Sequence, residues 1–218
     1  MGMRFRDRAE AGRRLAAGLP QFRERPDTIL LGLARGGVPL AAAAAEELYL
    51  PFGALLVRKL GIPGREETAF GALAWANGRV VRLVNRPLAE RILRLGISQA
   101  ALDAVEAHER GELLRRAGSY PGIRHELRGK TVVLVDDGLA TGATMRAAVE
   151  AVRAAGARTV VVAVPVASLE AYASLARVCD FVMCLHTPGK FRAVGSFYEH
   201  FEQLTDSEAV RMLEHPAS

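Results

Sequence analysis

The chain has 218 residues, of which 50% are hydrophobic and 24% are charged, and its formal net charge is +5. This length is sufficient for one α/β domain with a substantial core and too short for two such domains joined by a linker. No apolar run approaches the roughly 20 residues of a transmembrane helix, and residues 1–14 lack the apolar region of a secretory signal. We therefore expect a globular protein in the cytoplasm.

The two cysteines, Cys179 and Cys184, lie in a strand-like segment without a second pair of metal ligands nearby. We expect them to pack in the core rather than to bind zinc or form a disulfide. The basic residues are mostly arginines, which suit phosphate-bearing ligands because guanidinium binds phosphate in a bidentate manner. They are spread thinly along the chain, so a scattered, solvated surface charge is the simpler interpretation.

The first half of the chain predicts alternating helices and strands. An amphipathic helix is expected at residues 5–19, a buried strand at residues 28–34 and an Ala-rich helix at residues 38–48. A second strand at residues 52–57 leads into a stretch rich in Gly, Pro and charge at residues 61–67, which we expect to be a mobile loop.

Two short apolar runs then flank Asn77-Gly78, a pair that favours the type I′ turn of a β-hairpin. Pro87 begins a charged amphipathic pattern that predicts one long helix to about Arg116. Beyond it, strands are expected at residues 130–135, 159–164 and 181–185, and helices at residues 142–155 and 169–177. Continuous apolar strands that alternate with helices predict an open parallel sheet with helices on both faces, which binds ligands at the carboxyl ends of its strands.

The most informative segment follows the first strand of the second half. Two carboxylates, Asp136 and Asp137, end this strand, and a small hydroxyl-bearing loop leads directly into the next helix. Backbone N–H groups at the helix start and the hydroxyls of Thr141 and Thr144 form an anion cradle, which a ligand can approach closely at Gly142. Carboxylates beside such a cradle suit a ligand that carries both a phosphate and vicinal hydroxyls.

This segment resembles the signature of the type I phosphoribosyltransferase family, in which four apolar residues and two acids precede a Thr/Ser-Gly-Thr loop. The resemblance implies an α/β fold with a small hood and a flexible loop, and it implies binding of 5-phosphoribosyl-1-pyrophosphate (PRPP) with Mg²⁺. Asp136 and Asp137 would be the catalytic acids that hold the ribose 2′- and 3′-hydroxyls, with Asp137 also favouring positive charge on the reacting ring. The 5′-phosphate would be bound by Ala140, Thr141, Gly142, Ala143 and Thr144. At position 140 the family often has Thr or Ser, so one hydroxyl contact is missing here.

Two other strand ends fit the same resemblance. The pyrophosphate would be bound by residues that follow the first and second predicted strands, namely Ala34, Arg35, Gly36, Gly37, Arg58 and Lys59. On its own, the glycine pair is equally typical of a helix start. Mg²⁺ would be held through PRPP and water, with Asp136 as the candidate protein ligand.

In relatives of known activity a small hood receives the nucleophile. Here we expect the hood to come from about residues 1–24 and 187–218, with a contribution from the hairpin. Candidates for stacking on a base are Phe191, Phe197 and Tyr198. Packing within the hood would explain each of these aromatics equally well, and a structural role is also the simpler interpretation of His186.

The whole chain resembles a bacterial subgroup of phosphoribosyltransferases of undefined substrate. We therefore expect a single domain over residues 1–218, with a core at about residues 25–58 and 129–186 and a flexible loop and hairpin at about residues 60–84. Dimers are common among relatives, so a homodimer is an open expectation. The sequence assigns no role to Glu66 and Glu67.

The activity that the resemblance implies is Mg²⁺-dependent transfer of the 5-phosphoribosyl group from PRPP to a nitrogen nucleophile, with a nucleobase as the first candidate and release of pyrophosphate. The alternative is a regulatory protein that senses PRPP and binds nucleic acid without turnover. A dinucleotide-binding domain is disfavoured because Ala34 replaces the second Gly of G-x-G-x-x-G. A P-loop kinase is disfavoured because the sequence contains no P-loop motif.

Overall fold

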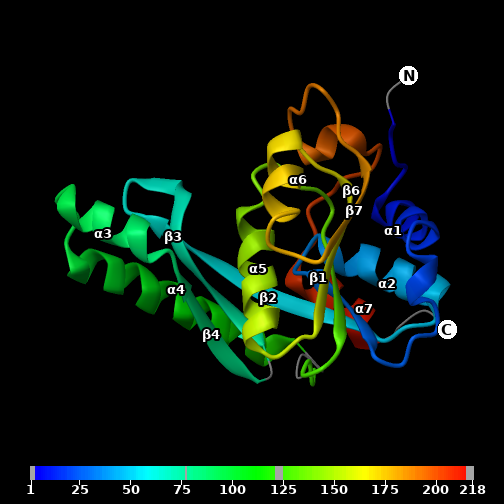
Figure 1. Cartoon of the computed structure of the whole chain (residues 1–218), viewed down its shortest axis with the longest axis horizontal. Helices are drawn as coiled ribbons and strands as arrows, with labels where there is room; N and C mark the ends of the chain where they lie inside the picture. The colour runs from blue at the N-terminus through cyan, green and yellow to red at the C-terminus, as the bar shows by residue number, and fades with distance from the viewer. Residues whose placement is uncertain (1–2, 77, 121–124, 215–218) are drawn as a thin grey trace.

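The computed structural model describes residues 3–76, 78–120 and 125–214, with only the backbone of Glu66 and Glu67 (Figure 1). Within these residues, seven strands form one sheet in the order β4-β3-β2-β1-β5-β6-β7. The strands from β2 to β7 in this order run parallel, while β3 and β4 are antiparallel to their neighbours. The strands are β1 (Thr28–Leu33), β2 (Phe52–Ile62), β3 (Arg65–Ala76), β4 (Arg79–Val84), β5 (Thr131–Val135), β6 (Thr159–Val166) and β7 (Phe181–His186).

Helices cover both faces of this sheet (Figure 1). The helices are α1 (Arg8–Ala17), α2 (Gly37–Leu48), α3 (Arg86–Arg94), α4 (Gln99–Ser119), α5 (Ala143–Ala154), α6 (Leu169–Leu175) and α7 (Asp206–Glu214), with short 3-10 helices at Pro20–Phe22 and Val194–Phe197. α5 and α6 pack on one face in a core with alternate residues of β1, β5 and β6, while α1 and α2 pack on the other. Within the described residues, none of these helices is long and apolar enough to cross a bilayer.

The open, mostly parallel sheet confirms the predicted fold class. Every residue of β1 and β5 is buried, as their continuous apolar sequences require for strands covered on both faces. β1, β5, β6 and β7 are present with their ends moved by a residue or two from the prediction, whereas β2 ends five residues later than predicted. Cys179 and Cys184 are free, half-buried thiols that pack against the core, as expected.

The predicted mobile loop at residues 61–67 is wrong. β2 continues to Ile62, and it pairs with β3 from Leu56↔Trp75 to Ile62↔Arg65. Gly64 makes the tight turn between the strands with a φ of +76°, which glycine adopts readily. The polar sequence gives no local sign of this hairpin. Its buried side chains pack against α3 and α4, which come later in the chain.

The long helix predicted from Pro87 to about Arg116 is also wrong as a single element. α3 ends at Arg94, Gly96 takes a φ of +94°, and the Ser98 hydroxyl accepts a hydrogen bond of 3.2 Å from the Ala101 amide at the start of α4. A glycine in the left-handed region followed by a serine N-cap ends one helix and begins the next. Both signals are present in the sequence.

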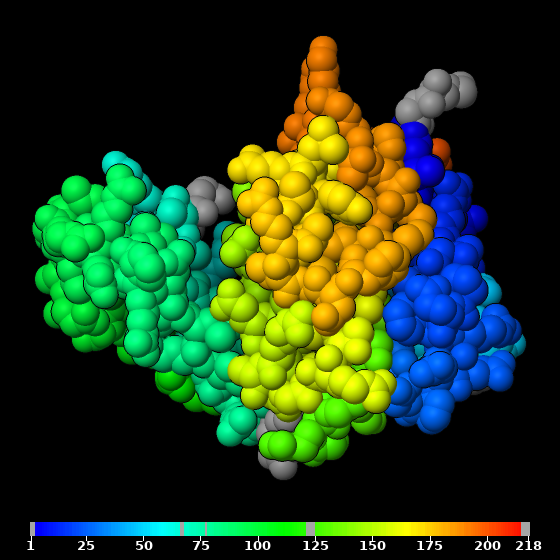
Figure 2. All heavy atoms as spheres, in the orientation of Figure 1, coloured from blue at the N-terminus to red at the C-terminus, as the bar shows by residue number. Residues whose placement is uncertain are grey.

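One part of the chain projects from the body of the molecule, and we call it the arm (Figures 1 and 2). The arm consists of β3, β4, α3, α4 and residues 58–62 of β2. The pairing of β3 with β4 confirms the predicted hairpin, although Asn77 of its turn lies outside the described residues. The arm occupies one edge of the sheet, at β4.

Residues 3–19 and 187–201, which are most of the expected hood at about residues 1–24 and 187–218, lie together at the opposite edge of the sheet, and we keep the name hood for them. The Phe5 amide donates to the Phe197 carbonyl at 2.8 Å, and the Glu199 amide donates to the Phe5 carbonyl at 2.9 Å, so the two ends of the chain are joined by backbone hydrogen bonds. α1 contacts β6 and β7. The expected contribution of the hairpin to the hood is therefore wrong, because the hairpin belongs to the arm.

Candidate active site

Polar groups gather where the parallel strands end, in the order that the sheet imposes. Lys59 lies on β2, Arg35 follows β1, Asp136 and Asp137 follow β5, and His186 ends β7. The chain leaves β1 toward β2 on one side, while β5 lies on the other side of β1. Such a switch point opens a crevice at the carboxyl ends of the strands, where open α/β sheets bind ligands.

The loop after β5 leaves a helix start uncapped. Gly142 precedes α5 with a φ of +73° and provides no side-chain cap. The backbone N–H groups of Thr141, Gly142 and Thr144 donate no hydrogen bond within the described residues. Unpaired N–H groups at the positive end of a helix dipole attract an anion. Of the five predicted phosphate residues, 140–144, three therefore present unpaired N–H groups at the start of a helix.

Ser168 supports this loop from the neighbouring strand. The Leu139 amide donates to the Val166 carbonyl at 2.9 Å, and the Ser168 amide donates back to the Leu139 carbonyl at 2.9 Å. The Ser168 hydroxyl donates to the Ala140 carbonyl at 2.8 Å and accepts from the Ala171 amide at 3.1 Å. One side chain therefore fixes the loop and also caps α6.

Arg8, a residue that the sequence did not indicate, contacts one of the two predicted catalytic acids. Its Nε and Nη2 atoms donate to the same oxygen of Asp137, Oδ2, at 3.0 and 2.9 Å. The two side chains are only 13% and 16% exposed, so this ion pair is poorly screened by water. Asp137 therefore keeps one carboxylate oxygen, Oδ1, without this partner.

Aromatic residues of the hood hold this ion pair in place. The Arg8 guanidinium lies 4.0 Å from the ring centroid of Phe201, and the Tyr198 hydroxyl donates to the backbone carbonyl of Asp137 at 2.7 Å. Because Tyr198 is 2% exposed, its ring has no free face, and its predicted role in base stacking is wrong. It acts as a buried support for the strand end, packed between Phe5 and Phe201.

Among the described residues, Asp136 has no ion-pair partner of its own. Its Oδ1 atom accepts a hydrogen bond of 3.0 Å from the Asp137 amide. Burial, together with the neighbouring Asp137 charge, raises the pKa of Asp136 well above its ordinary value. Burial also raises the pKa of Asp137, while Arg8 opposes this shift. Adjacent carboxylates with different surroundings are typical of functional sites.

The loop after β1 lies against these acids. A Cβ atom at Gly36 would come within 2.2 Å of Asp137 Oδ2, and one at Gly37 would come within 2.2 Å of the Val135 carbonyl oxygen. Position 37 therefore requires glycine because it lies against backbone, and a side chain at position 36 would displace the Asp137 carboxylate. Arg35 is exposed beside them, and its peptide bond with Ala34 is cis. The structure thus brings the two predicted loops together.

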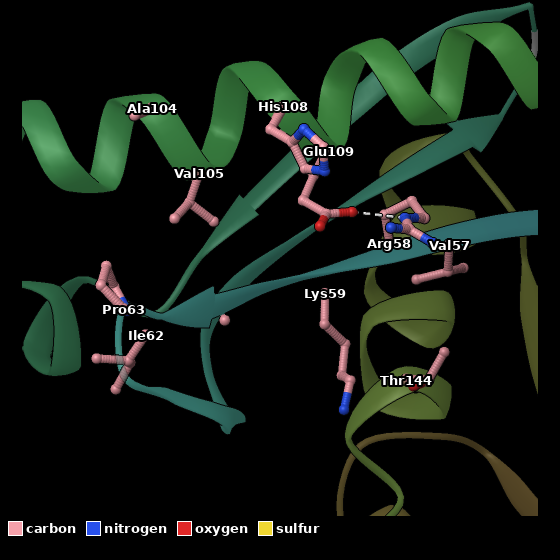
Figure 3. A pocket seen from close by; sticks show the side chains of 11 residues that line it. Val57, Arg58, Lys59, Ile62, Pro63, Ala104, Val105, His108, Glu109 and Thr144 are labelled. Atoms are coloured by element: carbon pink, nitrogen blue, oxygen red, sulfur yellow. Dashed lines mark hydrogen bonds and ion pairs between the residues drawn. The ribbon is translucent and has the colours of Figure 1, made fainter.

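The two basic residues of β2 have different surroundings. Arg58 forms an ion pair of 2.5 Å with Glu109 of α4. The Lys59 side chain has no hydrogen-bond or ion-pair partner within the described part of the chain, and it extends toward Thr144 at the start of α5 (Figure 3). Of the two, Lys59 is the residue free to meet an anion, while Arg58 is neutralised.

Two of the predicted stacking residues lie near the end of β7. The ring of Phe197 lies 5.6 Å from that of Phe191 and 5.9 Å from that of His186, measured between centroids. All three side chains are partly exposed. They form an aromatic group on the far side of the acids from Lys59.

The fold defines the class as an α/β protein with an open, mostly parallel sheet, and polar groups gather at the switch point of this sheet. A family model described as the phosphoribosyl transferase domain matches residues 6–191. The chain therefore belongs to the phosphoribosyl transferase domain family.

Similar proteins agree with this family. Two proteins from different strains of Mycobacterium tuberculosis, named as predicted phosphoribosyl transferases, are 43% identical over 213 residues, which are 96% of this chain and 46% of theirs. The chain thus spans about half the length of these curated relatives. The crystal structure of the protein TT1426 from Thermus thermophilus is 40% identical, with a TM-score of 0.84 over 99% of this chain and 100% of that one.

Proposed function

We propose that this chain transfers a 5-phosphoribosyl group from PRPP to a nitrogen nucleophile, with Mg²⁺ and with release of pyrophosphate. The single observation that carries the proposal is the junction at the end of β5. There the paired acids Asp136 and Asp137 lie against the glycine loop after β1, and the chain continues from them to the uncapped start of α5.

Each part of PRPP has a matching group in this arrangement. The N–H groups of Thr141, Gly142 and Thr144 suit the 5′-phosphate, because they supply several donors and a helix dipole at no cost in side-chain entropy. Asp136 and the free Oδ1 of Asp137 suit the ribose hydroxyls, which donate to carboxylates. Arg35, the amides of Gly36 and Gly37, and Lys59 suit the diphosphate.

The donor set also fits Mg²⁺. This ion prefers hard oxygen ligands and commonly keeps water while it binds through carboxylates and phosphates. Asp136 is the carboxylate without a cationic partner, so it is the protein residue that would hold the ion, together with diphosphate oxygens. When bound, Mg²⁺ would stabilise the charge of the departing diphosphate. Within the described residues, no group of three His, Cys, Asp or Glu is placed to bind a metal by itself.

The chain's own residues favour displacement at C1 of the ribose. Lys59 and Arg35 lie on the leaving-group side, and the two acids lie beside the ring, where they stabilise developing positive charge. The order along the sheet leaves the opposite side, toward β7, for the nucleophile. Phe191, Phe197 and His186 gather there, and partly exposed rings suit a planar acceptor such as a nucleobase.

The proposal is tested by pyrophosphate release. The native protein is mixed with PRPP, Mg²⁺ and one acceptor at a time from a panel of purines, pyrimidines and small amines. We expect release that requires both Mg²⁺ and one class of acceptor. Binding of nucleic acid that weakens with salt, with no pyrophosphate release from any acceptor, would instead indicate a regulatory protein.

A further inference from the structure

A pocket lies beside the proposed PRPP site, between the arm and α5. It has a volume of about 670 Å³, within the range of small-molecule pockets. It exists because β2 is longer than its neighbour. β1 pairs with β2 only as far as Leu33↔Leu55, whereas β2 continues to Ile62 and pairs there with β3 alone among the described strands.

This free edge of β2 gives the pocket backbone hydrogen-bonding groups. A strand without a neighbour on one side presents unpaired N–H and C=O groups in a regular row. α4 lies over the pocket, and the start of α5 closes its other side at Thr144 (Figure 3).

The two ends of the pocket differ in chemistry. At one end lie Lys59 and Thr144, the latter being the last residue of the proposed phosphate loop. At the other end the wall is apolar and consists of Ile62, Pro63, Ala104 and Val105 (Figure 3). The lining carboxylate, Glu109, is already neutralised by Arg58, so the lining favours an anion at Lys59.

PRPP does not account for the apolar wall, because a phosphorylated sugar has only polar groups to present. The wall suits a molecule with a flat, poorly hydrated body. The free strand edge favours a heterocycle over a hydrocarbon, since only a heterocycle satisfies the exposed backbone groups.

We propose that this pocket binds a phosphorylated planar heterocycle of nucleotide size, with its phosphate at Lys59 and its ring between α4 and the free edge of β2. The pocket lies on the diphosphate side of the ribose acids, opposite the side left for a nucleophile. Its occupant would therefore not be the acceptor. If the proposed function holds, the occupant shares Lys59 with the diphosphate and acts as a competitive inhibitor.

Isothermal titration calorimetry with AMP, GMP and UMP, each in the absence of PRPP, tests this site. Ala104→Trp fills the apolar end from an exposed helix position. Ala107→Trp is the matched control, because Ala107 is exposed on the same helix and does not line the pocket. We expect at least one nucleotide to bind the native protein, to bind Ala104→Trp about tenfold more weakly or worse, and to bind Ala107→Trp unchanged. Inorganic pyrophosphate should displace it.

The proposal is overturned if none of the three nucleotides binds at millimolar concentration, if Ala104→Trp binds as well as the native chain, or if pyrophosphate leaves binding unaffected. Melting curves of both variants show whether each is folded. Failure of the proposed function is distinguishable. If the protein binds nucleotides in this pattern but neither binds PRPP nor releases pyrophosphate, the nucleotide pocket is supported and the transferase activity is contradicted.

Discussion

Arg8 and Asp137 stand 129 positions apart in the sequence, yet two guanidinium nitrogens of Arg8 meet a single carboxylate oxygen of Asp137 within 3.0 Å. Through this contact the first turn of α1 reaches the acids at the end of β5. The hood therefore does more than cover the site, because it fixes the direction in which Asp137 presents its other oxygen.

Arg8→Gln should destabilise the protein by about 3 kcal/mol, because it leaves the largely buried Asp137 charge without its partner. Urea denaturation measures this change. Arg14→Gln is the matched control on the same helix, since its ion pair with Glu10 is more exposed and should contribute less than about 1 kcal/mol. Equal effects of the two substitutions would contradict a special role for Arg8.

Ser168→Ala should weaken phosphate binding as well as stability. It removes both the hydrogen bond to the Ala140 carbonyl and the cap of α6, at a cost of about 1 kcal/mol for each. Ser98→Ala removes a comparable cap, that of α4, without touching the loop. Titration with inorganic phosphate should therefore show weaker binding for Ser168→Ala and native binding for Ser98→Ala. Loss in both variants, or in neither, would argue against loop support by Ser168.

Asp206 should make the protein sensitive to acid. Although burial opposes ionisation of Asp206, hydrogen bonds from Arg116 and Tyr120 lower its pKa below the ordinary 3.8. Because the unfolded state then binds more protons, this contribution is present above the unfolded pKa and is lost as the pH falls through the folded pKa. Asp206→Asn should lower stability by about 2–3 kcal/mol at pH 7 and flatten the decline in acid.

Urea denaturation from pH 7 down to pH 2 measures both effects. Asp103→Asn is the control, because Asp103 is exposed on α4 and bonds only to Gln99 among the described residues. If Asp206→Asn and the native protein lose stability in parallel below the ordinary pKa of aspartate, the ion pair with Arg116 does not contribute.

The sequence predicts the centre of this fold because its signals are local. Apolar strands such as β5 are buried along their whole length, and the acids, the loop and the helix start that follow lie within nine residues. The same holds for the glycine loop after β1. Because β1 and β5 are parallel neighbours, the loops that follow them lie at the same edge of the sheet.

Contacts between distant segments were not predictable in this way. No local pattern links Arg8 to Asp137. Tyr198 has the aromatic ring of a stacking residue, but in the structure its hydroxyl donates a hydrogen bond to the Asp137 carbonyl at the strand end. The supposed loop at residues 61–67 is polar in sequence, but α3 and α4 bury one face of the hairpin it forms. Its order depends on helices that follow it in the chain.

Calorimetric titration of the native protein and of the variant Asp136→Asn with Asp137→Asn, using PRPP and Mg²⁺, tests most directly whether the acids and the adjoining loop form one sugar-phosphate site. Loss of hydrogen bonds to charged groups costs about 1.5–3 kcal/mol each. The affinity of the double variant should therefore fall steeply, while circular dichroism shows an unchanged fold. Equal affinity of the two folded proteins for the Mg²⁺ complex of PRPP would contradict the assignment of the ribose to these acids.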